Sequence, residues 1–181
     1  MGGSQGHAAA ALADSFPKLS LVVQDLPHVA EEGERYIKSL PSSSGGGDLA
    51  ARIHFQPHNF FDPQPVQAAD VYLLRQILHN WSFEDATKIL SRLVPALDTG
   101  RRSRIAIMDS VLPDPGTSQV STERMLRGRD LRMVQLFNAN ERGIEDWNDI
   151  LARVDSRLKL ESVTRPFGSI LSFLSVVFSD D

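Results

Sequence analysis

The chain has 181 residues, of which 41% are hydrophobic and 23% are charged, and its formal net charge is −4. This size fits one ordinary globular domain, and the mildly acidic balance excludes a general nucleic-acid binder, which needs clustered Lys and Arg. The sequence contains no cysteine, shows no basic leader followed by an apolar run, and has no apolar stretch long enough for a bilayer, so we expect a soluble, cytoplasmic protein without disulfides and without nucleic-acid or membrane partners.

Helix-like and strand-like segments alternate along the chain. A glycine-rich start at residues 2–6 precedes an alanine-rich segment, 7–14, which is predicted to be helical. Further helices are predicted over 29–40, 83–97, 121–137 and 144–154, with Ser82 as an N-cap. Strands are predicted over 19–24, 52–55, 70–77, 104–108, 158–164 and 169–178. A Pro-Ser-Gly loop is expected over 41–47.

Repeated β-α units followed by a terminal hairpin indicate an α/β sheet that is mostly parallel, with an antiparallel final strand. Ligands of such sheets bind at the carboxyl ends of the strands. The candidate functional residues are therefore those that directly follow each strand.

The glycine-rich start and Asp25 together suggest a nucleotide-type ligand. Glycines let the backbone approach a ligand closely, and the helix that follows offers free N–H groups. Asp25 ends the next predicted strand, about 20 residues after the last glycine, where an acidic residue binds a ribose diol in nucleotide-binding βαβ units. Taken separately, the glycines also suit an initiator segment or tag, and Asp25 also suits a turn.

An ordered set of short motifs then points to a family. The motifs are Gly2 to His7, Phe16-Pro17, Val22 to Pro27, His58 to Phe61, Leu73 to Trp81, Ile107 to Asp109 and Asn138 to Arg142. Through them the chain resembles the caffeate- and chalcone-type O-methyltransferases, especially the fungal ones, over essentially its whole length. The resemblance implies a Rossmann-like class I methyltransferase domain over residues 1–181, S-adenosyl-L-methionine as cofactor, and a phenolic or polyketide-type acceptor in secondary metabolism.

The resemblance also implies a cofactor-binding set, which consists of Gly2, Gly3, Gly6, Asp25, Leu26, Asn59, Phe60 and Arg75. In that set the glycines would lie near the methionine part and Asp25 would hold the ribose hydroxyls, with Leu26 beside the adenine. Asn59 stands where many relatives have Asp, so it keeps an acceptor but loses the charge. Arg75 stands where plant members often have Lys, and it also fits a structural ion pair.

A catalytic base is expected because a phenol, with a pKa of about 10, is only ~0.1% ionised near neutral pH. The resemblance assigns this role to His79, which follows an apolar strand and whose type suits proton transfer near neutral pH. It places two acidic residues beside the histidine, Asp109 and Glu141, although plant members carry Glu at the first position. Outside that match, each of the three also fits a plain loop or strand-end residue.

Other residues have weaker assignments. Asn80 replaces the usual Asp of a His-Asp-Trp motif and is expected to position rather than to tune the histidine. Met133, Leu136 and Phe137 suit the acceptor pocket of the family and, equally, an ordinary core. No metal is expected, because His54 and His58 are four residues apart but flank a strand end and a Pro-containing loop, so they do not form a helical ligand pair.

Family members carry an N-terminal helical region for dimerisation and a strand that leads into the glycine loop, and neither precedes Met1 here. We therefore expect a domain that is incomplete at its N-terminus and lacks its first strand, with weak cofactor binding and poor methyl transfer. A homodimer is expected only if the full gene product has the N-terminal domain. Two alternatives stay open: a catalytically weak remnant or interaction partner, and a cofactor-binding relative that catalyses another reaction, such as a cyclisation.

Overall fold

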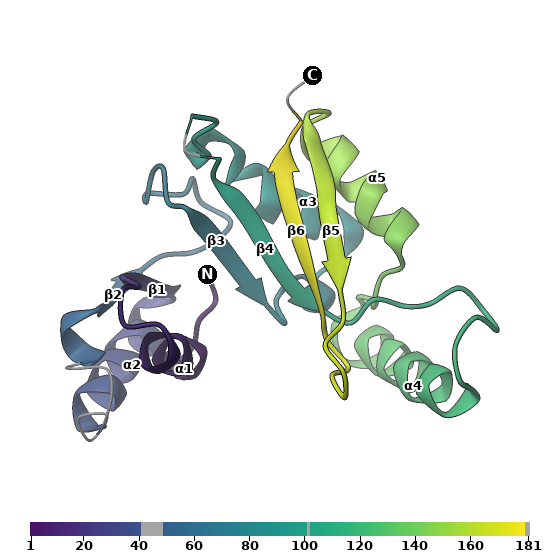
Figure 1. Ribbon diagram of the computed structural model, residues 1–181, viewed down its shortest axis with the longest axis horizontal. Helices are drawn as coiled ribbons and strands as arrows, with labels where there is room; N and C mark the ends of the chain where they lie inside the picture. The colour runs from purple at the N-terminus through teal and green to yellow at the C-terminus, as the bar shows by residue number, and fades with distance from the viewer. Residues whose placement is uncertain (41–48, 101, 180–181) are drawn as a thin grey trace. The chain divides into compact units, whose positions relative to one another are not determined.

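A computed structural model describes residues 1–40, 49–100 and 102–179 (Figure 1). The chain divides into two compact units, Met1–Asp62 and Pro63–Asp181, here called unit 1 and unit 2. The loop predicted over 41–47 lies outside the described residues.

Unit 1 contains two helices and a two-stranded parallel sheet. Its elements are α1 (His7–Ser15), β1 (Leu21–Asp25), α2 (Pro27–Ser39), the 3-10 turn η1 (Leu49–Ala51) and β2 (Ile53–Pro57). Strand β1 pairs with β2 in the register Leu21 to Ile53 through Asp25 to Pro57. The small core of unit 1 consists of Ala13, Val23, Ile37, Leu49 and Ile53. The predicted β-α-β order of this region is confirmed.

The contact between α2 and β2 depends on a glycine. A Cβ atom placed on Gly33 would lie 2.2 Å from Cε1 of Phe55, which is inside the contact distance of two carbon atoms. Gly33 therefore lets the aromatic ring of β2 pack directly on the backbone of α2. A glycine within a predicted helix costs stability, so close packing of this kind is the physical reason to find one here.

Unit 2 is built on a four-stranded sheet. Its elements are β3 (Val71–Arg75), η2 (Leu78–Asn80), α3 (Phe83–Ser91), η3 (Val94–Ala96), β4 (Arg104–Asp109), α4 (Val120–Phe137), α5 (Ile144–Val154), β5 (Leu158–Thr164) and β6 (Ser172–Phe178). The strand order is β3-β4-β6-β5, with β3 parallel to β4 and with β6 antiparallel to both of its neighbours. The antiparallel final strand is thus confirmed.

The sheet of unit 2 packs on two helices. Figure 1 shows α3 and α5 side by side behind the strands, and α5 contacts β5. The strands and these two helices contribute many of the fully buried apolar side chains: Leu74, Ile89, Leu90, Ile105, Ile107, Ile150 and Leu151. Strand β4 is largely buried and lies between β3 and β6, so the residue at its carboxyl end is held by strands on both sides.

The helix predicted over 83–97 is shorter than expected. Ser82 caps α3 by accepting the Asp85 N–H at 3.1 Å, as predicted, but the helix ends at Ser91 and a 3-10 turn follows. Pro95 explains the difference, because a proline has no N–H and its ring would clash with the carbonyl of Ser91 in a continued helix.

The strands of the described residues form two sheets, one of two strands and one of four. Within the described residues, β1 pairs as a strand only with β2, and β3 only with β4. In the part of the chain that the structure describes, every helix is too short or too polar to cross a bilayer.

Candidate functional site

His79 lies in a turn that directly follows β3. After Arg75 the backbone turns sharply at Gln76, whose φ of 53° is in the left-handed region that non-glycine residues rarely adopt. The N–H of Gln76 still donates to the carbonyl of Met108 at 2.9 Å, so the turn stays attached to β4. The 3-10 turn η2 then carries His79 into the interior, where it is only 6% exposed. Strained backbone that is held this firmly is typical of functional sites.

Glu141 lies against His79. Oε1 of Glu141 is 3.1 Å from Nδ1 of His79, and the carboxylate is fully buried. The backbone N–H of Glu141 donates to Oδ1 of Asp130 at 2.9 Å, and a guanidinium nitrogen of Arg129 lies 3.4 Å from Oε1. Two residues of α4 thus fix Glu141 before α5 begins. When Nδ1–H donates to Glu141, the neutral ring keeps its free lone pair on Nε2.

Asp109 is the last residue of β4 and is completely buried. No hydrogen bond of ordinary geometry reaches either of its carboxyl oxygens from the described residues, and the backbone N–H of His79 gives them only weak support. Burial raises the pKa of Asp109 from 3.8 to about 7, and the charge of Glu141 adds to this, while His79 and Arg142 oppose it. Asp109 therefore influences the site by charge and protonation, and Glu141 alone of the two acidic residues bonds the imidazole.

The pKa of His79 is raised above its ordinary 6.5. Burial by itself lowers this pKa, but the hydrogen bond that the ring donates to Glu141 and the charges of Asp109 and Glu141 outweigh the burial, and Arg129 opposes them weakly. The ring is thus a stronger base than a free histidine. Because the three groups interact, their protons dissociate as a cluster instead of independently.

The structure brings together three residues that the sequence proposes, His79, Asp109 and Glu141, and it adds two that the sequence did not single out as functional. Arg129 contacts Glu141, and Arg142 is buried below the turn that carries His79. The only sequence signal for Arg142 is its place next to Glu141 in the Asn-Glu-Arg motif. Asn80 donates weakly to the carbonyl of Gln76 at 3.4 Å, in keeping with a positioning role.

In unit 1 the glycine-rich segment lies against the end of β1. The N–H of Ser4 donates to one carboxylate oxygen of Asp25, and the N–H of Leu26 donates to the other, both at 2.8 Å. The N–H of Gly3 donates to the carbonyl of Gln24 at 3.1 Å. Each carboxylate oxygen of Asp25 thus keeps a lone pair for a further donor.

Backbone geometry explains all three glycines proposed for the cofactor. Gly6 has a φ of 83° and immediately precedes α1, whose N-terminus has no side-chain cap. A Cβ atom on Gly3 would lie 2.6 Å from Cγ1 of Val23. Gly2 also has a positive φ, of 61°. The segment is a stretch of backbone with few side chains, and it ends at the N-terminus of α1. Such backbone can approach an anionic or nucleotide ligand closely.

The loop after β2 approaches the same strand end. The N–H of His58 donates to the carbonyl of Asp25 at 2.8 Å, which brings Asn59 and Phe60 near β1. The side-chain oxygen of Asn59 accepts the N–H of Phe61 at 3.1 Å, so it retains one acceptor position. Leu26 is 45% exposed beside this loop. Seven of the eight proposed cofactor residues thus belong to unit 1. The eighth, Arg75, belongs to unit 2, where it is exposed at the end of β3.

The three residues proposed for either the acceptor pocket or the core differ in how far they are buried. Met133 is buried, but Leu136 is 62% exposed and Phe137 is 50% exposed. The core interpretation is therefore confirmed for Met133 and wrong for Leu136 and Phe137.

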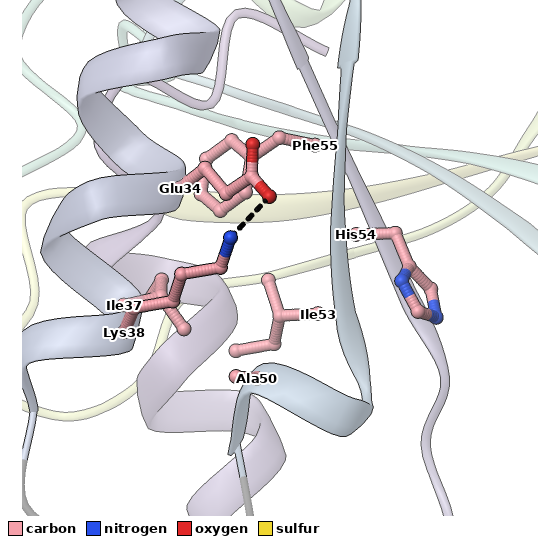
Figure 2. Close-up of a pocket in the computed structure, with 7 residues that line it drawn as sticks. All are labelled: Glu34, Ile37, Lys38, Ala50, Ile53, His54 and Phe55. Carbon is pink, nitrogen blue, oxygen red and sulfur yellow. Dashed lines mark hydrogen bonds and ion pairs between the residues drawn. The ribbon is translucent and has the colours of Figure 1, made fainter.

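A cavity of about 150 Å³ in unit 1 lies apart from the proposed residues. Figure 2 shows it between α2 and β2, where Ile37, Ile53 and Phe55 form an apolar wall and the Glu34–Lys38 ion pair lies across it. No side chain proposed for the cofactor or for catalysis lines it. The described residues contain no group of three or more potential ligands placed to hold a metal ion.

Comparison with known proteins gives a consistent result. The model of the O-methyltransferase domain family matches residues 1–155. The O-methyltransferase aoiF of Aspergillus oryzae is 51% identical over 176 residues, which are 97% of this chain and 40% of that protein. The chain thus spans less than half the length of that relative.

Two solved structures are similar in fold. One is described as a pericyclic reaction enzyme, with a TM-score of 0.80 and 30% identity over 99% of this chain and 42% of that one. The other is the O-methyltransferase NcsB1 from neocarzinostatin biosynthesis, in complex with S-adenosylmethionine and 2-hydroxy-5-methyl naphthoic acid. Its TM-score is 0.78, with 26% identity over 98% of this chain and 47% of that one.

Proposed function

Because the chain belongs to the O-methyltransferase domain family, we propose that it is the part of an O-methyltransferase that binds S-adenosylmethionine and supplies the catalytic base. The observation that carries this proposal is the buried His79–Glu141 pair at the carboxyl end of the sheet of unit 2. The acceptor that suits it is a hydroxyl on an aromatic or polyketide-type molecule, which needs a base to become a good nucleophile.

The residues of unit 1 fit the cofactor. Gly2, Gly3 and Gly6 would lie along its methionine part, since their backbone leaves no room for a Cβ at Gly3 and requires a positive φ at Gly2 and Gly6. Asp25 would accept hydrogen bonds from the ribose hydroxyls. Leu26, Asn59 and Phe60 would surround the adenine, and we assign Arg75 a supporting charge. When bound, the cofactor supplies an electrophilic methyl group.

In the proposed mechanism His79 acts through Nε2. Glu141 accepts Nδ1–H, which selects the tautomer with a free lone pair on Nε2 and stabilises the imidazolium that forms. The acceptor hydroxyl would give its proton to Nε2 as its oxygen forms the new bond to the methyl carbon and the carbon–sulfur bond breaks. Asp109 would add negative charge next to the imidazolium once it is itself ionised.

A second candidate function follows from the comparisons. One structural neighbour is described as a pericyclic reaction enzyme, so the same fold also occurs with a reaction other than methyl transfer. In that case the chain would bind the cofactor without consuming it. The histidine–glutamate pair favours methyl transfer, because a hydroxyl nucleophile needs a base and a pericyclic rearrangement does not.

The fate of the methyl group distinguishes these functions. The chain is incubated with S-adenosylmethionine labelled with ¹³C in the methyl group and with a panel of hydroxylated naphthoic acids and simple phenols. We expect the label to appear as an aromatic methyl ether, together with one S-adenosylhomocysteine for each ether. Cofactor binding without any labelled ether on the whole panel would contradict methyl transfer and favour the second candidate.

A further inference from the structure

Arg142 is a buried cation that bonds the backbone of the turn carrying His79. It is only 1% exposed. Its two terminal nitrogens donate to the carbonyl oxygens of Leu78 at 2.7 Å and of Trp81 at 2.6 Å. These carbonyls lie immediately on either side of His79 and Asn80, so the guanidinium spans the turn from one end to the other.

The backbone of Arg142 joins the same place to a second strand end. Its carbonyl accepts the N–H of Leu112 at 2.9 Å, and it forms an isolated parallel bridge with Val111. Asp109 lies two residues before Val111, and Glu141 is the residue directly before Arg142. The segments that carry the three proposed catalytic residues therefore all meet at this one arginine.

An ordinary ion pair does not account for this burial. Among the described residues, no carboxylate forms an ion pair with Arg142, and its charge is stabilised at longer range by Asp109, Asp146 and Glu141 and by the ring of Trp147, 5.5 Å away. Burying a cation without a direct partner is costly. The planar guanidinium is suited to two divergent acceptors, and both acceptors here belong to the His79 turn.

We propose that Arg142 is a positioning residue that holds the His79 turn against Glu141 by bridging the Leu78 and Trp81 carbonyls. The functional part of this inference depends on the proposed role of His79 as a base. The geometric part does not, and it can be tested without turnover.

The test is Arg142→Lys, which keeps the charge but loses the planar fork. The pKa of His79 is measured by following its imidazole signals by NMR as the pH changes. We expect this pKa to fall toward the ordinary value of 6.5, because a loosened turn weakens the hydrogen bond to Glu141. We also expect the amides of Asn80 and Trp81, which bond within the turn, to exchange faster, while those of Ile105 and Ile107 in β4 keep their protection.

A matched control uses the other arginine of the site. Arg129→Gln removes a charge that lowers the pKa of His79, so this variant should raise that pKa instead. An unchanged His79 pKa and unchanged turn exchange in Arg142→Lys would overturn the proposal. So would a uniform loss of protection or a failure to fold, since either makes Arg142 a stabiliser of the whole of unit 2.

A second measurement needs no variant. In the unsubstituted chain, the guanidinium protons of Arg142 should be resolved and slow to exchange, with cross-relaxation to Leu78 and Trp81. Rapid exchange of these protons would overturn the proposal. None of these results depends on methyl transfer, so a failure of the proposed function would be seen separately.

Discussion

Replacing His79 with glutamine should lower kcat for methyl transfer by about 10²–10⁴-fold, the usual contribution of a positioned base. Glutamine has a similar reach but cannot take a proton, and Glu141 would then bond an amide in place of an imidazole. Binding of S-adenosylhomocysteine should be unchanged, because the proposed cofactor residues of unit 1 are untouched. Initial rates with a labelled methyl donor, on an acceptor found in the panel above, measure the loss.

The pH dependence provides the diagnostic for this variant. In the unsubstituted chain, kcat/KM should rise tenfold per pH unit on the acid side and level off at an apparent pKa above 6.5, because the base must be neutral and the pKa of His79 is raised. His79→Gln should lose this limb. The exposed histidine of β2 provides the matched control, and His54→Gln should keep both rate and profile. A His79→Gln chain with an unaltered rate and profile would refute the assignment of the base.

Replacing Asp109 with asparagine should stabilise unit 2 while it weakens catalysis. Asp109 is completely buried, no hydrogen bond of ordinary geometry reaches it from the described residues, and burial raises its pKa from 3.8 to about 7. The folded state therefore holds this proton more tightly than the unfolded state. Stability is lost as pH rises from about 4 to about 7, and the full loss is on the order of 2–4 kcal/mol. Asparagine never ionises and avoids the loss.

The measurement is urea unfolding at several pH values, followed by the fluorescence of Trp81 and Trp147, which both lie in unit 2. The gain in the free energy of unfolding from Asp109→Asn should be largest at pH 8 and should shrink toward pH 4. The pKa of His79 is also raised, so its own contribution is present below pH 6.5 and is lost as pH rises further. Asp149→Asn on the exposed face of α5 is the control.

A gain from Asp109→Asn that is independent of pH, or a loss of stability at pH 8, would show that the carboxyl is not strained by burial. A carboxyl kept for function in apolar surroundings lowers stability, so its replacement should raise stability and lower activity. A stable but slow Asp109→Asn variant would support a catalytic reason for keeping this charge.

The element order was predictable because the apolar periodicity of each segment is strong. The helix over Ile144–Val154 and the strand over Leu158–Thr164 match their predicted ranges, since caps and turn residues bound them clearly. The end of α3 was not predictable from the apolar spacing alone, because that spacing continues past Ser91 while Pro95 prevents a continued helix. Leu136 and Phe137 have helical spacing, and only the packing of α4 shows that they are exposed.

Within the site, resemblance could name His79, Asp109 and Glu141 but could not distinguish the two carboxyls. Only the structure shows that Glu141 bonds the imidazole and that Asp109 does not. The bridge made by Arg142 depends on the left-handed turn at Gln76 and on two backbone carbonyls, which have no signature in a sequence.

The most direct test of the account is calorimetric titration of S-adenosylhomocysteine into the chain and into an Asp25→Asn variant, with folding checked by circular dichroism. We expect saturable binding that weakens by about tenfold or more in the variant, because the two ribose hydroxyls lose a charged partner. Asp14→Asn, which changes an exposed carboxylate on α1, should bind as the unsubstituted chain does. Equal binding by the Asp25→Asn variant, or no binding by a folded unsubstituted chain, would contradict the proposed cofactor site.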